Sequence, residues 1–157
     1  MFRENSKKHK IMSDERINEI LTDATSGVLA LQGEEYPYGV PLSYYYNGKE
    51  LIFHSRFIGH KVEMIRNNPK ASFTIIYKDT IKPELRTTNY ESVIVFGKVE
   101  EMTDVEEKKK NLLGFCSKYS PGFDETNIEC SNNNVENVCV LKMSMDYVSG
   151  KFQEREK

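Results

Sequence analysis

The residues best suited to chemistry lie in the segment Phe53–Lys61, which reads FHSRFIGHK. An apolar run ends in this segment, and a helical pattern begins after Gly59. Free N–H groups at a helix start, the positive end of the helix dipole and a lysine in the first turn together suit a phosphate dianion. The His60 ring and the Ser55 hydroxyl can add further donors. We therefore predict an anion-binding site that includes Lys61.

The same segment has a simpler interpretation, in which Gly59 makes only a turn and Lys61 is a solvated helix residue. A Gly-His-Lys sequence by itself does not separate the two interpretations. His54 and His60 do not form a zinc-ligand pattern with a cysteine or a carboxylate, so we expect no metal site. The ordinary pKa of histidine suits proton transfer, which makes His54 a candidate catalytic residue.

A second candidate element is the strand-like run 37–44, which Pro41 interrupts. Proline donates no hydrogen bond to a β-ladder, so this strand belongs at an edge or at a bulge. Its unpaired backbone groups could hydrogen-bond a flat heterocycle that lies against Val40 and Leu42. The alternative is a sheet edge that proline protects from unwanted pairing, and both interpretations can hold together.

The elements that must position these residues follow from hydrophobic periodicity and turn signals. Ser13 predicts the N-cap of a short amphipathic helix, and the pair Asn47-Gly48 predicts a hairpin turn. Thr103 and Glu106 form the pattern of a capping box ahead of a helix that ends at Tyr119. Strands are predicted at 27–31, 40–46, 51–54, 71–77, 92–99 and 138–147, a short helix at 59–68, and polar loops at 82–89 and 131–137.

Length and composition indicate the number of domains and exclude some classes of partner. The chain has 157 residues, 29% of them charged, and a formal net charge of -2, which suits one globular domain over 1–157 with a polar tail at 1–12. Near-neutral charge disfavours nucleic acid as a partner, and no apolar run approaches the roughly 20 residues of a membrane span. We expect a cytoplasmic protein. Three widely spaced cysteines predict reduced thiols, with Cys139 in the core and Cys130 in a reactive polar loop.

Six strands and a single crossover helix between the third and fourth favour an antiparallel barrel over a parallel sheet. The predicted fold class is therefore α+β, mainly antiparallel β, with flanking helices.

The order of five motifs resembles the pyridoxamine 5′-phosphate oxidase-like flavoprotein superfamily, and within it the nitroimidazole-resistance protein group is most similar. The resemblance covers almost the whole chain. The motifs, none of them specific alone, are YPYGVPLSY at 36–44, LIFHS at 51–55, GHK at 59–61, NPKASF at 68–73 and YESVIVFGKV at 90–99.

The resemblance implies a six-stranded split β-barrel of Greek-key type that forms a homodimer, with FMN in a cleft shared by the subunits. It assigns one group to the isoalloxazine ring: Val40, Pro41, Leu42 and Ser43. It assigns a second group to the phosphate and ribityl chain: His54, Ser55, His60 and Lys61. A third group would close the site: Tyr90, Ser92 and Val93.

The chain departs from the family in two places. Pyridoxamine phosphate oxidases end with an aromatic and basic signature, whereas this chain ends SGKFQEREK, so vitamin B6 oxidation is disfavoured. The Gly-x-Gly-x-x-Gly fingerprint is also absent from the sequence, so NAD(P)H could dock only transiently.

The first functional hypothesis is an FMN-dependent reductase of a small acceptor, a nitroaromatic such as a 5-nitroimidazole or a quinone. His54 is then the candidate proton donor. The alternative is a non-catalytic protein that carries flavin or haem, with His54 or His60 as a candidate axial ligand.

Overall fold

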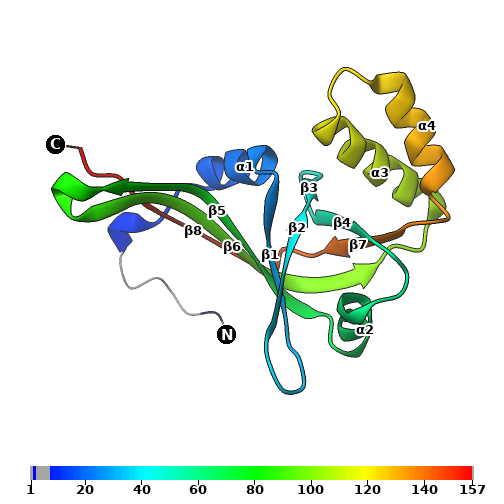
Figure 1. The fold of residues 1–157 in the computed structure, drawn as a ribbon, viewed down its shortest axis with the longest axis horizontal. Helices are drawn as coiled ribbons and strands as arrows, with labels where there is room; N and C mark the ends of the chain where they lie inside the picture. Colours follow the sequence, from blue (N-terminus) through cyan, green and yellow to red (C-terminus); the bar gives the residue numbers. More distant parts are fainter. Residues whose placement is uncertain (1, 3–7, 157) are drawn as a thin grey trace.

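A computed structural model describes Phe2 and residues 8–156 of the chain. The described residues form a mainly antiparallel sheet with helices at its faces and ends (Figure 1). The helices are η1 (Lys8–Lys10), α1 (Asp14–Asp23), α2 (His60–Asn67), η2 (Pro83–Leu85), α3 (Val105–Tyr119) and α4 (Asp124–Asn134). The strands are β1 (Ser26–Leu31), β2 (Tyr38–Ser43), β3 (Tyr45–Tyr46), β4 (Leu51–Ser55), β5 (Lys70–Lys82), β6 (Thr87–Glu101), β7 (Cys139–Met143) and β8 (Tyr147–Gln153).

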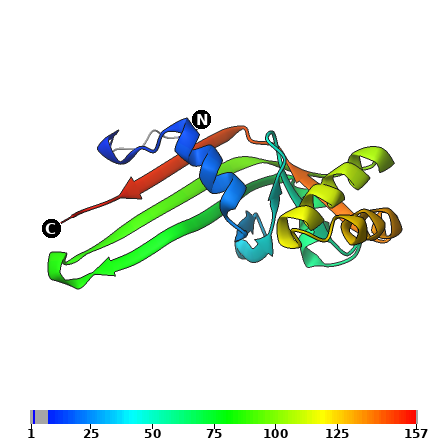
Figure 2. The same cartoon turned by 90° about the horizontal axis from the view of Figure 1, so that it is seen from above.

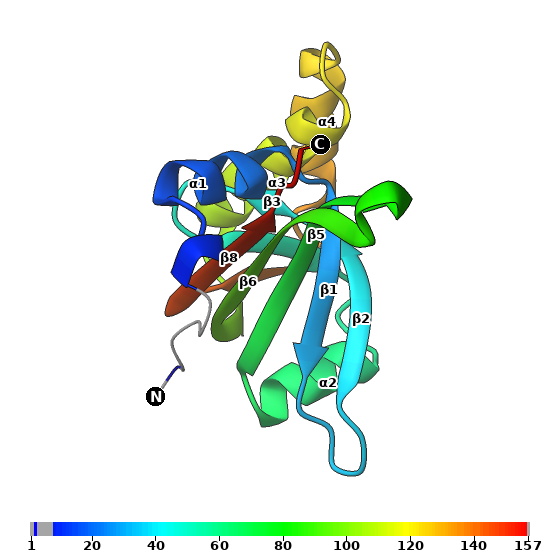
Figure 3. The ribbon, with the colours of Figure 1, turned by 90° about the vertical axis from the view of Figure 1, so that its left-hand side faces the viewer.

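The sheet order is β2-β1-β5-β6-β7-β4-β3, and β8 also pairs with β6. Strand β6 links the two halves, because its residues 90–96 pair with β8 and its residues 99–101 pair with β7. Figure 3 shows β8, β6, β5, β1 and β2 side by side in one half. This arrangement confirms the α+β class and is consistent with a split barrel.

The predicted number of strands was wrong, since the described residues form eight and not six. The run 40–46 divides into β2 and β3 at Tyr44, whose fully buried hydroxyl donates to the carbonyl of Leu21 at 2.8 Å. The run 138–147 divides near Ser144, where the chain leaves one half of the sheet for the other. A Cβ at Gly97 would lie 1.8 Å from the Ser144 carbonyl oxygen, so only glycine permits this close crossing.

The polar stretch 82–89 was predicted to be a loop, but half of it is strand, because Lys82 ends β5 and residues 87–89 begin β6. Strands β5 and β6 pair as far as Lys82 and Thr87, and they form a long arm that projects from the body (Figure 2). Arg86 adopts the left-handed region, with φ of 48°, to close the turn. Polar residues can pair here because the tip of the arm faces solvent, where Ile81 is 73% exposed.

Two clusters of buried side chains hold the sheet and helices together. The larger cluster includes Ile20, Leu29 and Phe73. Ser13 caps α1 as predicted, because its hydroxyl accepts from the N–H of Arg16 at 3.3 Å. The smaller cluster places Leu112 of α3 against the sheet, alongside Ile52, Val140, Met102 and Val135. Helix α3 therefore covers the face of β4 that is opposite to the main core.

The helical hairpin of α3 and α4 differs from the sequence prediction at both ends. The N-cap of α3 is Asp104 and not Thr103, since its carboxylate accepts from the N–H of Glu107 at 2.7 Å. Helix α4 occupies part of the region predicted as a polar loop, and it carries Cys130 on its exposed surface. Its composition of Asp, Glu, Thr and Asn has almost no apolar periodicity, which is why the pattern did not reveal it.

Half of the predicted N-terminal tail, residues 1 and 3–7, lies outside the described residues. Of its described part, Met12 is buried against Gly150, and Ile11 forms a β-bridge with Lys151. Within residues 8–156, no helix is both long and apolar enough to cross a membrane.

Candidate functional site

The first turn of α2 begins without a capping side chain. Its N-cap is Gly59, with φ of 143°, whose carbonyl accepts from the N–H groups of Val62 and Glu63 at 2.9 and 3.1 Å. A Cβ added to Gly59 would meet nothing within 4 Å, so the space in front of the helix is open. Among the described residues, no group accepts a hydrogen bond from the N–H of His60 or Lys61. This turn offers free donors and a positive dipole end to an anion.

Lys61 and His54 lie close to each other at the end of β4. Burial lowers the pKa of the half-buried Lys61 ammonium. Partial burial also lowers the pKa of His54, and the positive charge of Lys61 lowers it further. The imidazole is consequently neutral at pH 7 and can donate through one ring nitrogen and accept through the other. Lys61 lies in the first turn of α2, beside an open helix start, where the predicted anion site places it.

Cys139 is buried at the start of β7, next to the end of β4. It pairs with Ser55 across the β4–β7 ladder, and its thiol donates to the Glu101 carboxylate at 3.6 Å. Burial, followed by the charge of Glu101, raises the pKa of Cys139 to about 11. Cys139 is therefore a protonated core thiol, as predicted, and not a nucleophile.

Strand β2 is an edge of the sheet, since it pairs only with β1. The position of Pro41 on an edge strand is thereby confirmed. Val40 and Leu42 pack against the main core, whereas Pro41 and Ser43 are exposed. A heterocycle beside β2 would meet Pro41, Ser43 and the free backbone edge rather than the two apolar side chains.

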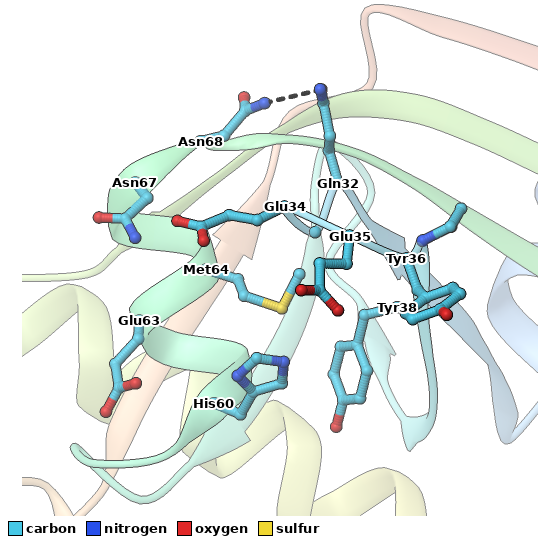
Figure 4. A pocket seen from close by; sticks show the side chains of 12 residues that line it. Gln32, Glu34, Glu35, Tyr36, Tyr38, His60, Glu63, Met64, Asn67 and Asn68 are labelled. Carbon is cyan, nitrogen blue, oxygen red and sulfur yellow. Dashed lines mark hydrogen bonds between the residues drawn. The ribbon is translucent and has the colours of Figure 1, made fainter.

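A cavity of about 740 Å³ lies between α2 and the loop that joins β1 to β2. Figure 4 shows Glu35 and Met64 pointing into it, with Tyr38 beside His60. The rings of Tyr38 and His60 meet edge to face at a centroid distance of 4.9 Å. Of the predicted site residues, His60 is the one that lines this cavity.

The third predicted group lies elsewhere in the subunit. Tyr90, Ser92 and Val93 belong to β6, and strands β1 and β5 separate β6 from β2. Three strand spacings amount to roughly 14 Å. Val93 is fully buried in the main core, whereas Tyr90 and Ser92 are partly exposed. One subunit therefore does not bring this group beside Pro41 on β2.

Helix α3 provides one wall of the site, which the sequence pattern did not indicate. Phe115 packs its ring edge to face against His54 at 4.7 Å, and the Tyr119 hydroxyl donates to the Tyr44 carbonyl at 2.7 Å. The Lys108 ammonium lies 5.5 Å from the ring centroid of Phe57. The spacing of residues 108, 115 and 119 indicates a shared helix face, but a spacing does not tell which strand that face covers.

Comparison with known proteins agrees with this architecture. A sequence model of the family described as pyridoxamine 5′-phosphate oxidase matches residues 13–152. A candidate 5-nitroimidazole antibiotic resistance protein from Bacteroides thetaiotaomicron VPI-5482 is 28% identical, with a TM-score of 0.78 over 91% of this chain and 86% of that one. No match is found among the curated proteins.

Two more distant structures share the fold. A FAD-binding protein from Mesorhizobium loti is 23% identical, with a TM-score of 0.68 over 93% of this chain and 97% of that one. The FAD and heme binding protein from Mycobacterium smegmatis is 18% identical, with a TM-score of 0.75 over 91% and 72% of the two chains. The family match over 140 residues, 13 to 152, confirms the resemblance seen in the five motifs: the chain belongs to the pyridoxamine 5′-phosphate oxidase family.

Proposed function

We propose that the protein binds FMN and reduces a small acceptor, such as a nitroaromatic or a quinone. The observation that carries this proposal is the open, uncapped first turn of α2 beside Lys61. Membership of a family named for a flavin oxidase supports a flavin, as do the FAD-binding proteins of the same fold. A single anion site at the helix start suits the single phosphate of FMN.

In this proposal the chain supplies binding and electrostatics. The N–H groups of His60 and Lys61 donate to the phosphate oxygens, and the Lys61 ammonium neutralises their charge. The Ser55 hydroxyl and the His60 ring add donors, while Pro41 and Ser43 contact the ring along the β2 edge. A bound flavin supplies the capacity to accept a hydride and to pass electrons on.

His54 is the residue of the site with a role in proton transfer. Reduction of a nitro group consumes protons, and the His54 imidazole lies at the end of β4, near Lys61. Phe115 fixes the plane of the imidazole by its edge contact. Since the lowered pKa leaves the ring neutral at pH 7, it donates an N–H hydrogen bond there and becomes an acid only at lower pH.

We also propose a cytoplasmic homodimer whose subunits meet through the outer face of the sheet. Cross-strand registers place two uncharged rows on that face, Pro41–Val28–Thr74–Ile94 and Gly39–Ala30–Ser72–Phe96. Val28 is 40% exposed there. A second copy on this face would cover these residues and could bring its Tyr90 and Ser92 to the flavin, which one subunit does not.

The test is a spectrum and a mass measurement of the cofactor released from freshly purified protein. FMN and an absorption pair typical of oxidised flavin are expected, with bleaching by NAD(P)H and recovery on addition of a nitroaromatic. Protein that stays colourless and takes up neither FMN nor FAD would refute the proposal. Light scattering that gives a monomer with tightly bound FMN would refute the shared site.

A second candidate function is haem binding. His60 faces the 740 Å³ cavity together with Met64, whereas Phe115 packs against the His54 ring, so His60 is the better axial ligand candidate. A protein of this fold binds both FAD and heme. Haem reconstitution that gives a Soret band, lost in His60→Ala and kept in His54→Ala, would favour this function.

A further inference from the structure

Two of the three cysteines lie on neighbouring helices. Cys116 is in the last turn of α3 and is partly exposed, whereas Cys130 lies in the second half of α4 and is exposed. The two helices form an antiparallel hairpin and pack side by side (Figure 1). A disulfide joins Cα atoms about 4.4–6.8 Å apart, so it can link only residues at the same level of such a hairpin.

Contacts at both ends of the hairpin define which residues are level with each other. Near the connecting loop, the buried Asn127 amide donates to the Ser120 carbonyl at 2.8 Å. At the open end, Leu112 of α3 and Val135, the C-cap of α4, belong to the same buried cluster. Because the two helices run in opposite directions with the same rise per residue, these contacts place position 116 opposite position 131.

Cys130 immediately precedes position 131, and its sulfur is a neighbour of the Cys116 sulfur. Burial, followed by the charge and a side-chain hydrogen bond of Cys130, raises the pKa of the Cys116 thiol. A side-chain hydrogen bond requires the two sulfur atoms to be in contact. Asn134, one turn further along α4, donates to the Cys130 sulfur at 3.4 Å. The hairpin therefore brings two free thiols together across its helices.

The third cysteine has a different environment. Cys139 is buried in β7, and its thiol donates to the Glu101 carboxylate at 3.6 Å. A small oxidant in solution can reach the exposed Cys130 directly, whereas Cys139 is covered. In a reducing compartment, a disulfide is usually transient and redox-sensing rather than structural. The pair on the hairpin has the access that such a role requires, and Cys139 does not.

We propose that Cys116 and Cys130 form a reversible dithiol–disulfide site that reacts with low-molecular-weight disulfides. The inference goes beyond the proposed function and does not depend on flavin binding. Cys130, as a thiolate, attacks one sulfur of the small disulfide, so a mixed disulfide forms and one small thiolate leaves. Cys116 then loses its proton and attacks the Cys130 sulfur, which forms the Cys116–Cys130 bond and releases the second small thiolate.

This exchange balances without a further oxidant. The protein loses two electrons and two protons, and the small disulfide is reduced to two thiols as its leaving thiolates take up the two protons. An excess of a small thiol drives the same two steps backwards.

The first test treats reduced protein with glutathione disulfide and measures the intact mass. Wild-type protein should lose two hydrogen atoms, and a tryptic digest should contain two peptides joined through Cys116 and Cys130. Trypsin leaves Cys130 and Cys139 in one peptide, 119–142, so Cys139→Ala serves as the control and should give the same joined product. A stable glutathione adduct without loss of hydrogen, or a disulfide between two copies of the chain, would overturn the proposal.

Single variants test the order of the two steps. Cys116→Ser should stop at the mixed disulfide and keep glutathione on Cys130. Cys130→Ser should react with glutathione disulfide at least about 10-fold more slowly than wild type, because Cys116 is less accessible. A Cys130→Ser variant that reacts as fast as wild type would contradict the role assigned to Cys130.

A third measurement uses Cys139→Ala, which keeps only this pair of thiols. The folded protein should become oxidised at a ratio of glutathione disulfide to glutathione at least about 10-fold lower than the unfolded chain in urea, because the hairpin raises the effective concentration of one thiol at the other. The same ratio for both states would mean that the fold does not hold the two sulfur atoms together, and the proposal would fail.

Discussion

The first turn of α2 separates two surfaces of opposite charge. On one side, Lys61 lies near His54 at the end of β4. On the other side, the face of α2 that carries His60 and Glu63 lines the cavity, and Glu34 and Glu35 approach it from the β1–β2 loop. Both surfaces meet at two consecutive residues, 60 and 61, because neighbouring positions on a helix point about 100° apart.

This difference in charge between the two surfaces determines the orientation of a bound ligand. An anion is stabilised at the lysine side, whereas three glutamates around the cavity repel it. The cavity instead suits neutral or cationic groups that donate hydrogen bonds to carboxylates and stack on the Tyr38 ring. In the proposed function, the phosphate therefore lies toward β4, and the acidic cavity remains free for another part of a ligand.

The largest expected effect concerns the lysine side. Lys61→Ala should weaken FMN binding by about 1.5–3 kcal/mol, because a charge-assisted contact to the phosphate is lost. Riboflavin binding should not change. Isothermal titration with both ligands measures the effect, and Lys49→Ala, at an exposed position of the β3–β4 turn, is the control. Equal losses for FMN and riboflavin would show that Lys61 contacts the ring or only supports the fold.

The second effect concerns the backbone that opens the site. Gly59 has φ of 143° and ψ of 159°, a region that is essentially reserved for glycine, so Gly59→Ala should cost about 1–3 kcal/mol of unfolding free energy. The distortion should also weaken FMN binding, since the N–H groups of the first turn lose their alignment.

Gly48 supplies the matched control for that variant. Its φ is 90°, an added Cβ would also meet nothing within 4 Å, and it lies in the β3–β4 turn. Gly48→Ala should thus destabilise the fold in urea denaturation without changing the affinity for FMN. If both alanine variants bind FMN equally well per folded molecule, the α2 start is not part of the site.

The start of α2 shows which features of the candidate site could be predicted from the sequence. The glycine, the helix start and Lys61 were predicted because all three depend on local chemistry, and the hairpin at Asn47 followed from turn chemistry, with β3 and β4 pairing through Tyr45 and Ile52. The contact of Phe115 with His54 was missed because it depends on the packing of α3 across β4, a long-range contact that no local pattern encodes. The division of the run 138–147 was missed for the same reason, since it depends on the crossing at Gly97.

A smaller effect is expected at the cavity that Glu34, Glu35 and Glu63 line. Glu63→Gln removes one carboxylate from the first turn of α2, and FMN affinity should rise by a few tenths of a kcal/mol, because a repulsion from an exposed charge is weak in water. The gain should disappear at about 1 M salt, where the Debye length is roughly 3 Å. Glu129→Gln, an exposed position in α4, controls for net charge. A loss of affinity in Glu63→Gln would mean that this carboxylate binds the ligand rather than repelling an anion.

The smallest effect links the two sides through proton binding at His54. Because burial and Lys61 lower the pKa of folded His54, the unfolded chain binds a proton more readily than the folded one. The contribution of His54 to stability is therefore fully present above its unfolded pKa of about 6.5 and declines as the pH falls below that value. Urea midpoints at pH 7.5 and 5.5 should differ more for wild type than for His54→Gln. Lys61→Ala should reduce the difference, because the lysine charge is one of the two causes of the lowered His54 pKa. Solvent reaches much of the imidazole, so the difference between the two urea midpoints should be modest. If Lys61→Ala leaves this difference unchanged, the charge of Lys61 does not act on His54.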